Sequence, residues 1–149
     1  MKIVVDTNII FSSLLKTQTT FGQIIFNSDD IFEFYSAQYM RTEISNHWDK
    51  LKKISKLTDK QLEESYYTLL TKISFINEEL IPQKIWEDSE IIADGIDIDD
   101  TDFIALTKHL KGKLWTGDKT LRDGLKSKGF KSVLTTTEIL KLWTKEKER

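Results

Sequence analysis

The chain of 149 residues has no cysteine, which excludes disulfides, thiolate nucleophiles and cysteine-based zinc or iron–sulfur sites. Its two histidines, His47 and His109, are too few for a histidine-rich metal cage. The only proline is Pro82, the six glycines are scattered, and no linker, repeat or low-complexity segment is recognisable. No apolar run approaches the ~20 residues that a membrane-spanning helix needs. The sequence therefore predicts a globular protein that has no thiol chemistry and no membrane span.

Length and composition fit one domain over residues 1–149, of which we expect about 144–149 to fray at the C-terminus. Hydrophobic residues make up 39% of the chain and charged residues 31%, as in ordinary globular proteins. The opening Met-Lys-Ile-Val-Val-Asp is a strand pattern interrupted by an acid, so it lacks the apolar core of a signal peptide. We therefore expect a cytoplasmic protein.

The net charge of −2 hides a strong asymmetry along the chain. Residues 85–107 contain eight acids and no Lys or Arg, whereas residues 108–149 contain twelve Lys or Arg against five acids. The acidic segment could attract cations and the basic segment could attract phosphates, as a metal-assisted attack on a polyanion would need. Solvated helix faces would give the same pattern, and on charge alone this second interpretation is the better one.

Short apolar and β-branched runs alternate with segments of helical periodicity. Strands are predicted over residues 2–5, 31–35, 73–76, 113–116 and 132–134. Helices are predicted over residues 20–27, 38–54, 59–70, 81–93, 100–110, 119–128 and 137–147. This alternation favours an α/β fold, a three-layer α/β/α sandwich with a mainly parallel sheet of about five strands and Rossmann-like topology.

Local signals fix several of these boundaries. Thr58 and Gln61 have the spacing of a capping box at the start of helix 59–70, and Pro82 suits the first turn of helix 81–93. Gly112 and Gly129 should end the helices that precede them. Helix 38–54 should present one apolar stripe, formed by Met40, Ile44, Trp48, Leu51 and Ile54.

Acids stand where the predicted strands end. Asp6 directly follows the first strand, and Asp118 follows the fourth after a single glycine. If strand order reverses at the first strand, the first and fourth strands are neighbours and these two carboxylates converge. Asp100 begins the helix that leads into the fourth strand, and Glu43 lies one to two turns into the helix after the second. We therefore expect all four acids at one edge of the sheet.

Carboxylates gathered at one place repel one another unless a cation or a proton compensates them. Mg²⁺ prefers oxygen ligands and keeps several waters, and it commonly binds through a few carboxylates and substrate phosphates. Such a site can orient and activate a water for in-line attack on a phosphodiester. The four acids thus suggest metal-assisted hydrolysis, which needs no nucleophilic side chain.

Each acid also has a purely structural explanation. Asp100 and Asp118 could be N-caps, and Asp6 could form a turn with Thr7 and Asn8. Glu43 could be a solvated residue that pairs with His47. These explanations compete well for single residues, but four acids at one sheet edge favour the shared site.

Four segments together resemble the PIN-domain family. They are residues 4–8 (VVDTN), 41–44 (RTEI), 99–106 (DDTDFIAL) and 114–119 (LWTGDK), which follow one another in the family's order over residues 2 to about 134. The resemblance implies a Mg²⁺- or Mn²⁺-dependent endoribonuclease, commonly the toxin of a toxin–antitoxin pair and often a homodimer. It implies Asp6, Glu43, Asp100 and Asp118 as catalytic metal ligands, with Asn8 and Thr116 assisting by hydrogen bonds.

Other residues leave alternatives open. Asp102 and Asp99 are candidates for an extra metal ligand beside Asp100. Lys119 and Arg122 are candidates for phosphate binding, and an exposed basic helix face explains them equally well. Trp48 and Trp115 could stack on bases, but their apolar surroundings favour a place in the core or an interface.

Other function classes fit the sequence less well. A receiver domain would need an Asp after the third strand and a Lys after the fifth, where this chain has Ile76-Asn77 and Thr135. A haloacid-dehalogenase-like phosphohydrolase would need a second Asp at the position of Asn8. A catalytically silent PIN-like scaffold that binds a partner protein is disfavoured by the presence of all four acids.

Overall fold

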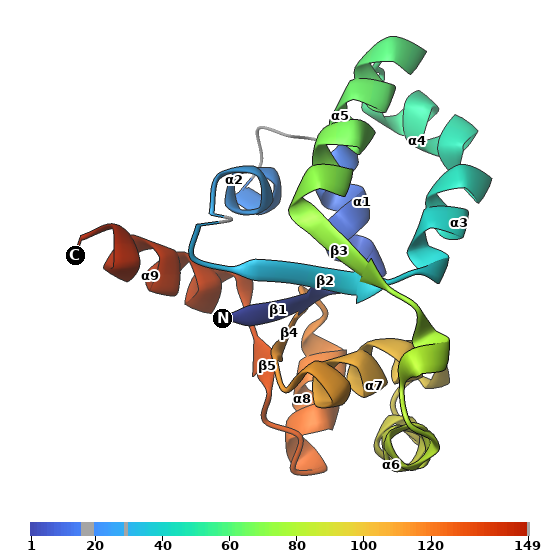
Figure 1. Ribbon diagram of the computed structural model, residues 1–149, viewed down its shortest axis with the longest axis vertical. Helices are drawn as coiled ribbons and strands as arrows, with labels where there is room; N and C mark the ends of the chain where they lie inside the picture. Colours follow the sequence, from blue (N-terminus) through green and yellow to red (C-terminus); the bar gives the residue numbers. More distant parts are fainter. Residues whose placement is uncertain (16–19, 29, 149) are drawn as a thin grey trace.

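Five parallel strands form the centre of the structure, a computed structural model that describes residues 1–15, 20–28 and 30–148. Their order in the sheet is β3-β2-β1-β4-β5, and every neighbouring pair is parallel. The strands are β1 (Lys2–Val5), β2 (Glu33–Ala37), β3 (Ile73–Ile76), β4 (Lys113–Trp115) and β5 (Val133–Leu134). Helices cover both faces of the sheet, so the predicted three-layer α/β/α sandwich is confirmed (Figure 1).

Helices α1 to α5 lie on one face of the sheet and α6 to α8 on the other, while α9 contacts α2 (Figure 1). Their bounds are α1 Thr7–Leu15, α2 Thr20–Asn27, α3 Tyr39–Asn46, α4 Trp48–Ser55, α5 Asp59–Lys72, α6 Gln83–Ala93, α7 Thr101–Leu110, α8 Lys119–Ser127 and α9 Thr136–Lys147. Two short 3₁₀ turns, η1 (Glu78–Leu80) and η2 (Ile98–Asp100), precede α6 and α7. Across the described ranges, no helix is long and apolar enough to cross a membrane.

Two helical segments differ from the prediction. The single helix expected over residues 38–54 is two helices, α3 and α4, separated at His47. The predicted apolar stripe is largely confirmed, because Met40, Ile44 and Leu51 are buried and Trp48 packs against the core, but Ile54 is 54% exposed instead of buried. Helix α1 was not predicted at all, and it replaces the turn considered for residues 6–8. At the other end of the chain, α9 continues to Lys147, into the segment expected to fray.

The central strands are buried on both sides. Ile3, Val4 and Val5 of β1 are fully buried, as expected for a strand in the middle of a covered parallel sheet. Trp115 of β4 is also fully buried, and its indole N–H donates to Thr136 Oγ1 at 3.0 Å. The idea that Trp115 stacks on bases is therefore wrong, since a solvent-inaccessible ring cannot meet a base.

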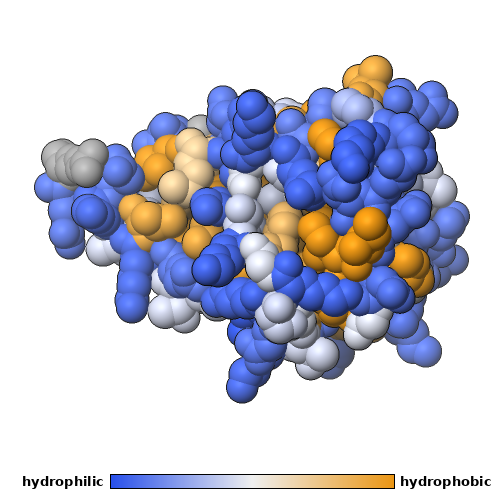
Figure 2. All heavy atoms as spheres, turned by 90° about the horizontal axis from the view of Figure 1, so that it is seen from below, coloured by the Kyte–Doolittle hydropathy of each residue, from blue (hydrophilic) through white to orange (hydrophobic). Residues whose placement is uncertain are grey.

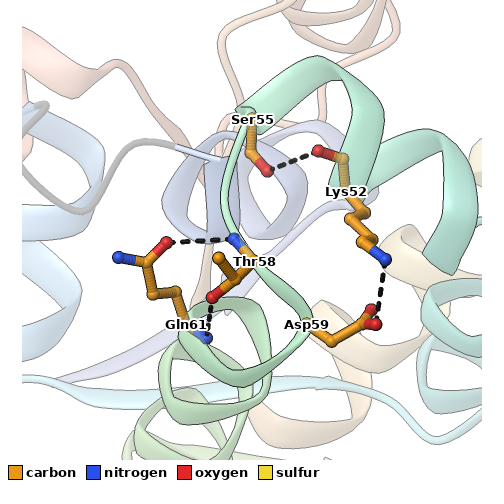
Figure 3. A network of polar contacts seen from close by, with 5 residues as sticks. All are labelled: Lys52, Ser55, Thr58, Asp59 and Gln61. Carbon is orange, nitrogen blue, oxygen red and sulfur yellow. Dashed lines mark hydrogen bonds and ion pairs between the residues drawn. The ribbon is translucent and has the colours of Figure 1, made fainter.

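The junction between α4 and α5 shows how local sequence positions a helix (Figure 3). The Thr58 side chain accepts from the Gln61 N–H at 3.2 Å, and Gln61 Oε1 accepts from the Thr58 N–H at 3.0 Å. This confirms the predicted capping box, and such a cap is typically worth about 1 kcal/mol. Lys52 Nζ lies 2.9 Å from Asp59 Oδ2 across the same turn and lowers the pKa of that exposed carboxyl.

Candidate functional site

The carboxyl ends of β1 and β4 lie side by side, because Val5 pairs with Trp115 in the parallel register. The predicted neighbourhood of the first and fourth strands is thus confirmed. The next residues along the two strands are Asp6 and Thr116, and both are buried. The Thr116 hydroxyl is hydrogen-bonded to the Asp6 carboxylate and accepts from the Asp118 N–H at 3.1 Å. Thr116 therefore links the two acids that the sequence predicts at this edge.

Asp6 is only 4% exposed. Burial raises the pKa of its carboxyl, and the negative charge of Asp118 raises the pKa further. Hydrogen bonds from Thr116 and from the Ile9 N–H, which lies 3.0 Å from Oδ1, oppose the rise without cancelling it. The Ile9 bond also caps the start of α1. An ionised Asp6 is thus poorly solvated, which is the state that a nearby cation would stabilise.

Asp118 is exposed at the N-cap of α8, where its Oδ1 accepts from the Leu121 N–H at 3.1 Å. One turn further along α8, the Arg122 guanidinium donates from Nη1 to the Thr116 carbonyl oxygen at 3.1 Å. This bond holds the Arg122 side chain at the carboxyl end of β4. Lys119 is exposed at the first position of α8. We call Asp6, Thr116, Asp118 and Arg122 the rim.

A hollow of about 490 Å³ opens beside the rim, lined by the other acids of the prediction. Glu43 comes from α3, Asp100 from η2 and Asp102 from α7, and Thr7, directly after Asp6, also lines the hollow. The structure thus places the predicted acids in two groups, one at the rim and one in this acidic hollow, and Thr7, next to Asp6, connects them. The side chain of Asp99 lies outside what the structure describes.

The acids of the hollow have partners of their own. Glu43 Oε2 lies 3.3 Å from His47 Nε2, so the pairing considered from sequence is present. Asp100 occupies the N-cap position of α7 but makes no side-chain cap hydrogen bond, which removes the capping explanation for its carboxylate. Burial, followed by the charge of Glu78, raises the pKa of Asp102. Asn8, expected to assist at the metal, is exposed in the first turn of α1.

Tyr39 also lines the hollow, Glu78 accepts a hydrogen bond from its backbone, and sequence reasoning missed both residues. Burial and then the charge of Asp102 raise the pKa of the Tyr39 hydroxyl, which is hydrogen-bonded to Thr7, so this hydroxyl stays protonated. Glu78 Oε1 accepts from the Tyr39 N–H at 2.8 Å. A sequence signal for Tyr39 exists, since it begins the helix directly after the second strand.

The oxygen ligands fit a hydrated Mg²⁺ or Mn²⁺ better than a closed metal cage. Among residues 1–15, 20–28 and 30–148, no three acidic or histidine side chains are grouped tightly enough to hold a metal alone. Mg²⁺ keeps several waters and commonly uses one or two carboxylates together with substrate phosphates. Asp6 and Asp118 offer such a pair. Because burial destabilises the ionised Asp6 carboxylate, a bound cation would stabilise it.

The fold and the rim define a three-layer α/β protein that carries carboxylates beyond the ends of its two central strands. A sequence model of the PIN domain matches residues 4–147, and the chain therefore belongs to the PIN-domain family. The fold is similar to a chain in the crystal structure of VapBC2 from Rickettsia felis bound to a DNA fragment from their promoter, with a TM-score of 0.64 and 14% identity. The similarity covers 91% of this chain and 97% of the other. No curated protein sequence matches the chain.

Proposed function

We propose that the protein is a metal-dependent endoribonuclease that hydrolyses RNA phosphodiester bonds with Mg²⁺ or Mn²⁺. The observation that carries the proposal is the buried Asp6 carboxylate, linked through Thr116 to Asp118 at the ends of neighbouring strands. Membership of the PIN-domain family supports the same assignment, because its members are typically nucleases.

Each residue has a part in this reaction. Asp6 and Asp118 would hold the ion, which when bound lowers the pKa of a water and stabilises charge on the phosphate. Thr116 fixes the orientation of the Asp6 carboxylate. Glu43 and Asp100, the other two proposed metal ligands, line the adjoining hollow together with Asp102, and their carboxylates would complete the hydrated site. Arg122 and Lys119 would bind phosphates that flank the scissile bond.

The decisive experiment compares Asp118→Asn with Asp123→Asn, a change of the same size on an exposed residue of the same helix. Asn is as good an N-cap as Asp, so the start of α8 is retained. We expect Asp118→Asn to reduce RNA cleavage in Mg²⁺ by about 10²-fold or more and Asp123→Asn to leave it unchanged, as followed on a labelled RNA. Equal cleavage by wild-type protein in EDTA would overturn the proposal.

A catalytically silent PIN-like scaffold is the second candidate. It is favoured by one observation, that Glu43 and Asp118 already have partners in His47 and the Leu121 N–H. The same experiment separates the two candidates, since a scaffold cleaves no RNA under any metal condition.

We also propose a homodimer, and an antitoxin protein as a further partner. Apolar surface gathers on the α6 side of the face shown in Figure 2. Ile91 of α6 is 71% exposed and Ile98 of η2 is 63% exposed, and these two elements are in contact. Exposed apolar surface of this kind marks protein interaction sites.

We expect light scattering to give the mass of a dimer for the wild type and of a monomer for an Ile91→Lys/Ile98→Lys variant. Ile54→Lys, which also changes an exposed isoleucine, should remain dimeric. A monomeric wild type at all concentrations would refute the dimer.

A further inference from the structure

A second hollow, of about 440 Å³, lies at the end of the sheet opposite the rim. Lys113, which lines it, is the first residue of β4, whereas the rim follows the last residue of that strand. Lys108, Lys111 and Lys131 also line this hollow, over the apolar side chains of Ile85 and Phe130. No acidic residue is among the described residues that line it. We call it the lysine hollow.

The turn at Lys111 and Gly112, which brings Lys111 to the hollow, is tightly fixed. Lys111 caps the C-terminus of α7 in the left-handed conformation, with φ 57°. The following Gly112 donates its N–H to the Thr107 carbonyl oxygen at 3.1 Å. A Cβ at Gly112 would lie 2.7 Å from the backbone oxygen of Lys2, so only glycine allows this approach of the turn to β1. The backbone position of Lys111 at the hollow is therefore fixed.

Overall charge does not explain this arrangement, because the chain has a net charge of −2. Lys108 and Lys111 lie at the C-terminus of α7, where positive charge complements the helix dipole. Lys113 begins β4 and Lys131 lies between α8 and β5, so the dipole of α7 does not explain these two lysines. Four lysines around one hollow concentrate positive charge there, which a bound anion complements.

We propose that the lysine hollow binds backbone phosphates of single-stranded RNA, at a site separate from the acidic rim. Lysine ammonium groups bind phosphate as point charges. Helix α8 begins at the rim and ends two residues before Gly129, which also lines the lysine hollow. Nine helical residues span about 13 Å, so one RNA strand can contact both places. The RNA identity of the ligand rests on the proposed function.

The test measures binding without cleavage. Fluorescence anisotropy of a labelled single-stranded RNA of about 20 nucleotides, in EDTA and at several salt concentrations, compares wild type with a Lys111→Gln/Lys131→Gln variant. We expect about 10-fold weaker binding at about 0.1 M salt, and a salt slope reduced by about 1.4 for two lost phosphate contacts. The matched control is Lys50→Gln/Lys53→Gln, which removes two exposed lysines from α4.

Unchanged binding by the Lys111→Gln/Lys131→Gln variant would overturn the inference, and so would an equal loss in the α4 control. Competition by poly-glutamate as effective as competition by RNA would overturn the assignment to phosphates. If wild-type protein cleaves no RNA in Mg²⁺ while binding still depends on Lys111 and Lys131, the nuclease proposal fails and the lysine hollow stands.

Discussion

Asp6→Asn is expected to reduce RNA cleavage in Mg²⁺ by about 10²- to 10³-fold and, at the same time, to raise the thermal unfolding midpoint in EDTA. The first effect follows because the proposed ion loses its buried carboxylate. The second follows because burial is the largest influence on the Asp6 pKa and acts against the ionised form. Asn removes the charge and keeps an oxygen that can accept from the Ile9 N–H.

The pH dependence of stability gives an independent check. The pKa of Asp6 is higher in the folded than in the unfolded protein, so the folded state binds more protons between the two values. Stability in EDTA should therefore fall as pH rises from the ordinary Asp pKa of 3.8 through the raised folded value. In Asp6→Asn this part of the pH dependence is absent, as denaturant titrations at a series of pH values would show.

Asp118→Asn is the matched control for the stability effect. Asp118 is exposed, so removing its charge relieves little desolvation. The unfolding midpoint of the Asp118→Asn protein in EDTA should therefore change far less than that of the Asp6→Asn protein. Both variants should lose cleavage. If Asp6→Asn were instead strongly destabilised in EDTA, the hydrogen bonds to its carboxylate would outweigh the cost of burial, and the case for a cation at Asp6 would weaken.

Sequence patterns predicted all five strands because each contains a short apolar run. β1 and β3 were predicted with their observed bounds, whereas the second strand was predicted over residues 31–35 and β2 lies two residues later, at Glu33–Ala37. Helix α1 was missed because Asp6 and Asn8 suggested a turn, although Ile9, Ile10, Ser13 and Leu14 have helical spacing and are buried. The break at His47 could not be predicted, since apolar residues continue at helical spacing on both sides of it.

The site was predicted in the same uneven way. Asp6 directly follows β1 and Asp118 lies three residues after the end of the neighbouring β4, so topology alone brings them to one edge. Tyr39 and Glu78 meet through the pairing of β2 with β3, whose register ends with the Gln38 N–H donating to the Ile76 carbonyl oxygen at 2.9 Å. That register depends on how the two strands align in three dimensions. No local pattern around Glu78 indicates the contact.

Trp115→Ala is expected to lower the free energy of unfolding by about 3–5 kcal/mol, a large part of the ~5–15 kcal/mol that stabilises a typical domain. The indole ring is fully buried and contacts the rings of Phe21 and Phe34, at 6.0 and 6.2 Å between centroids. Alanine would leave a cavity under β4 and would leave the Thr136 hydroxyl without the indole N–H.

Trp115→Phe is the informative control, because it keeps an aromatic ring and loses only part of the volume and the hydrogen bond. Urea unfolding should show a clearly smaller loss of unfolding free energy for Trp115→Phe than for Trp115→Ala. Since Thr116 follows Trp115 directly, the alanine variant should also weaken cleavage by shifting the Asp6 contact. A Trp115→Ala protein of unchanged stability but reduced RNA affinity would mean that bases reach the ring and that the indole does not hold β4 against the neighbouring helices.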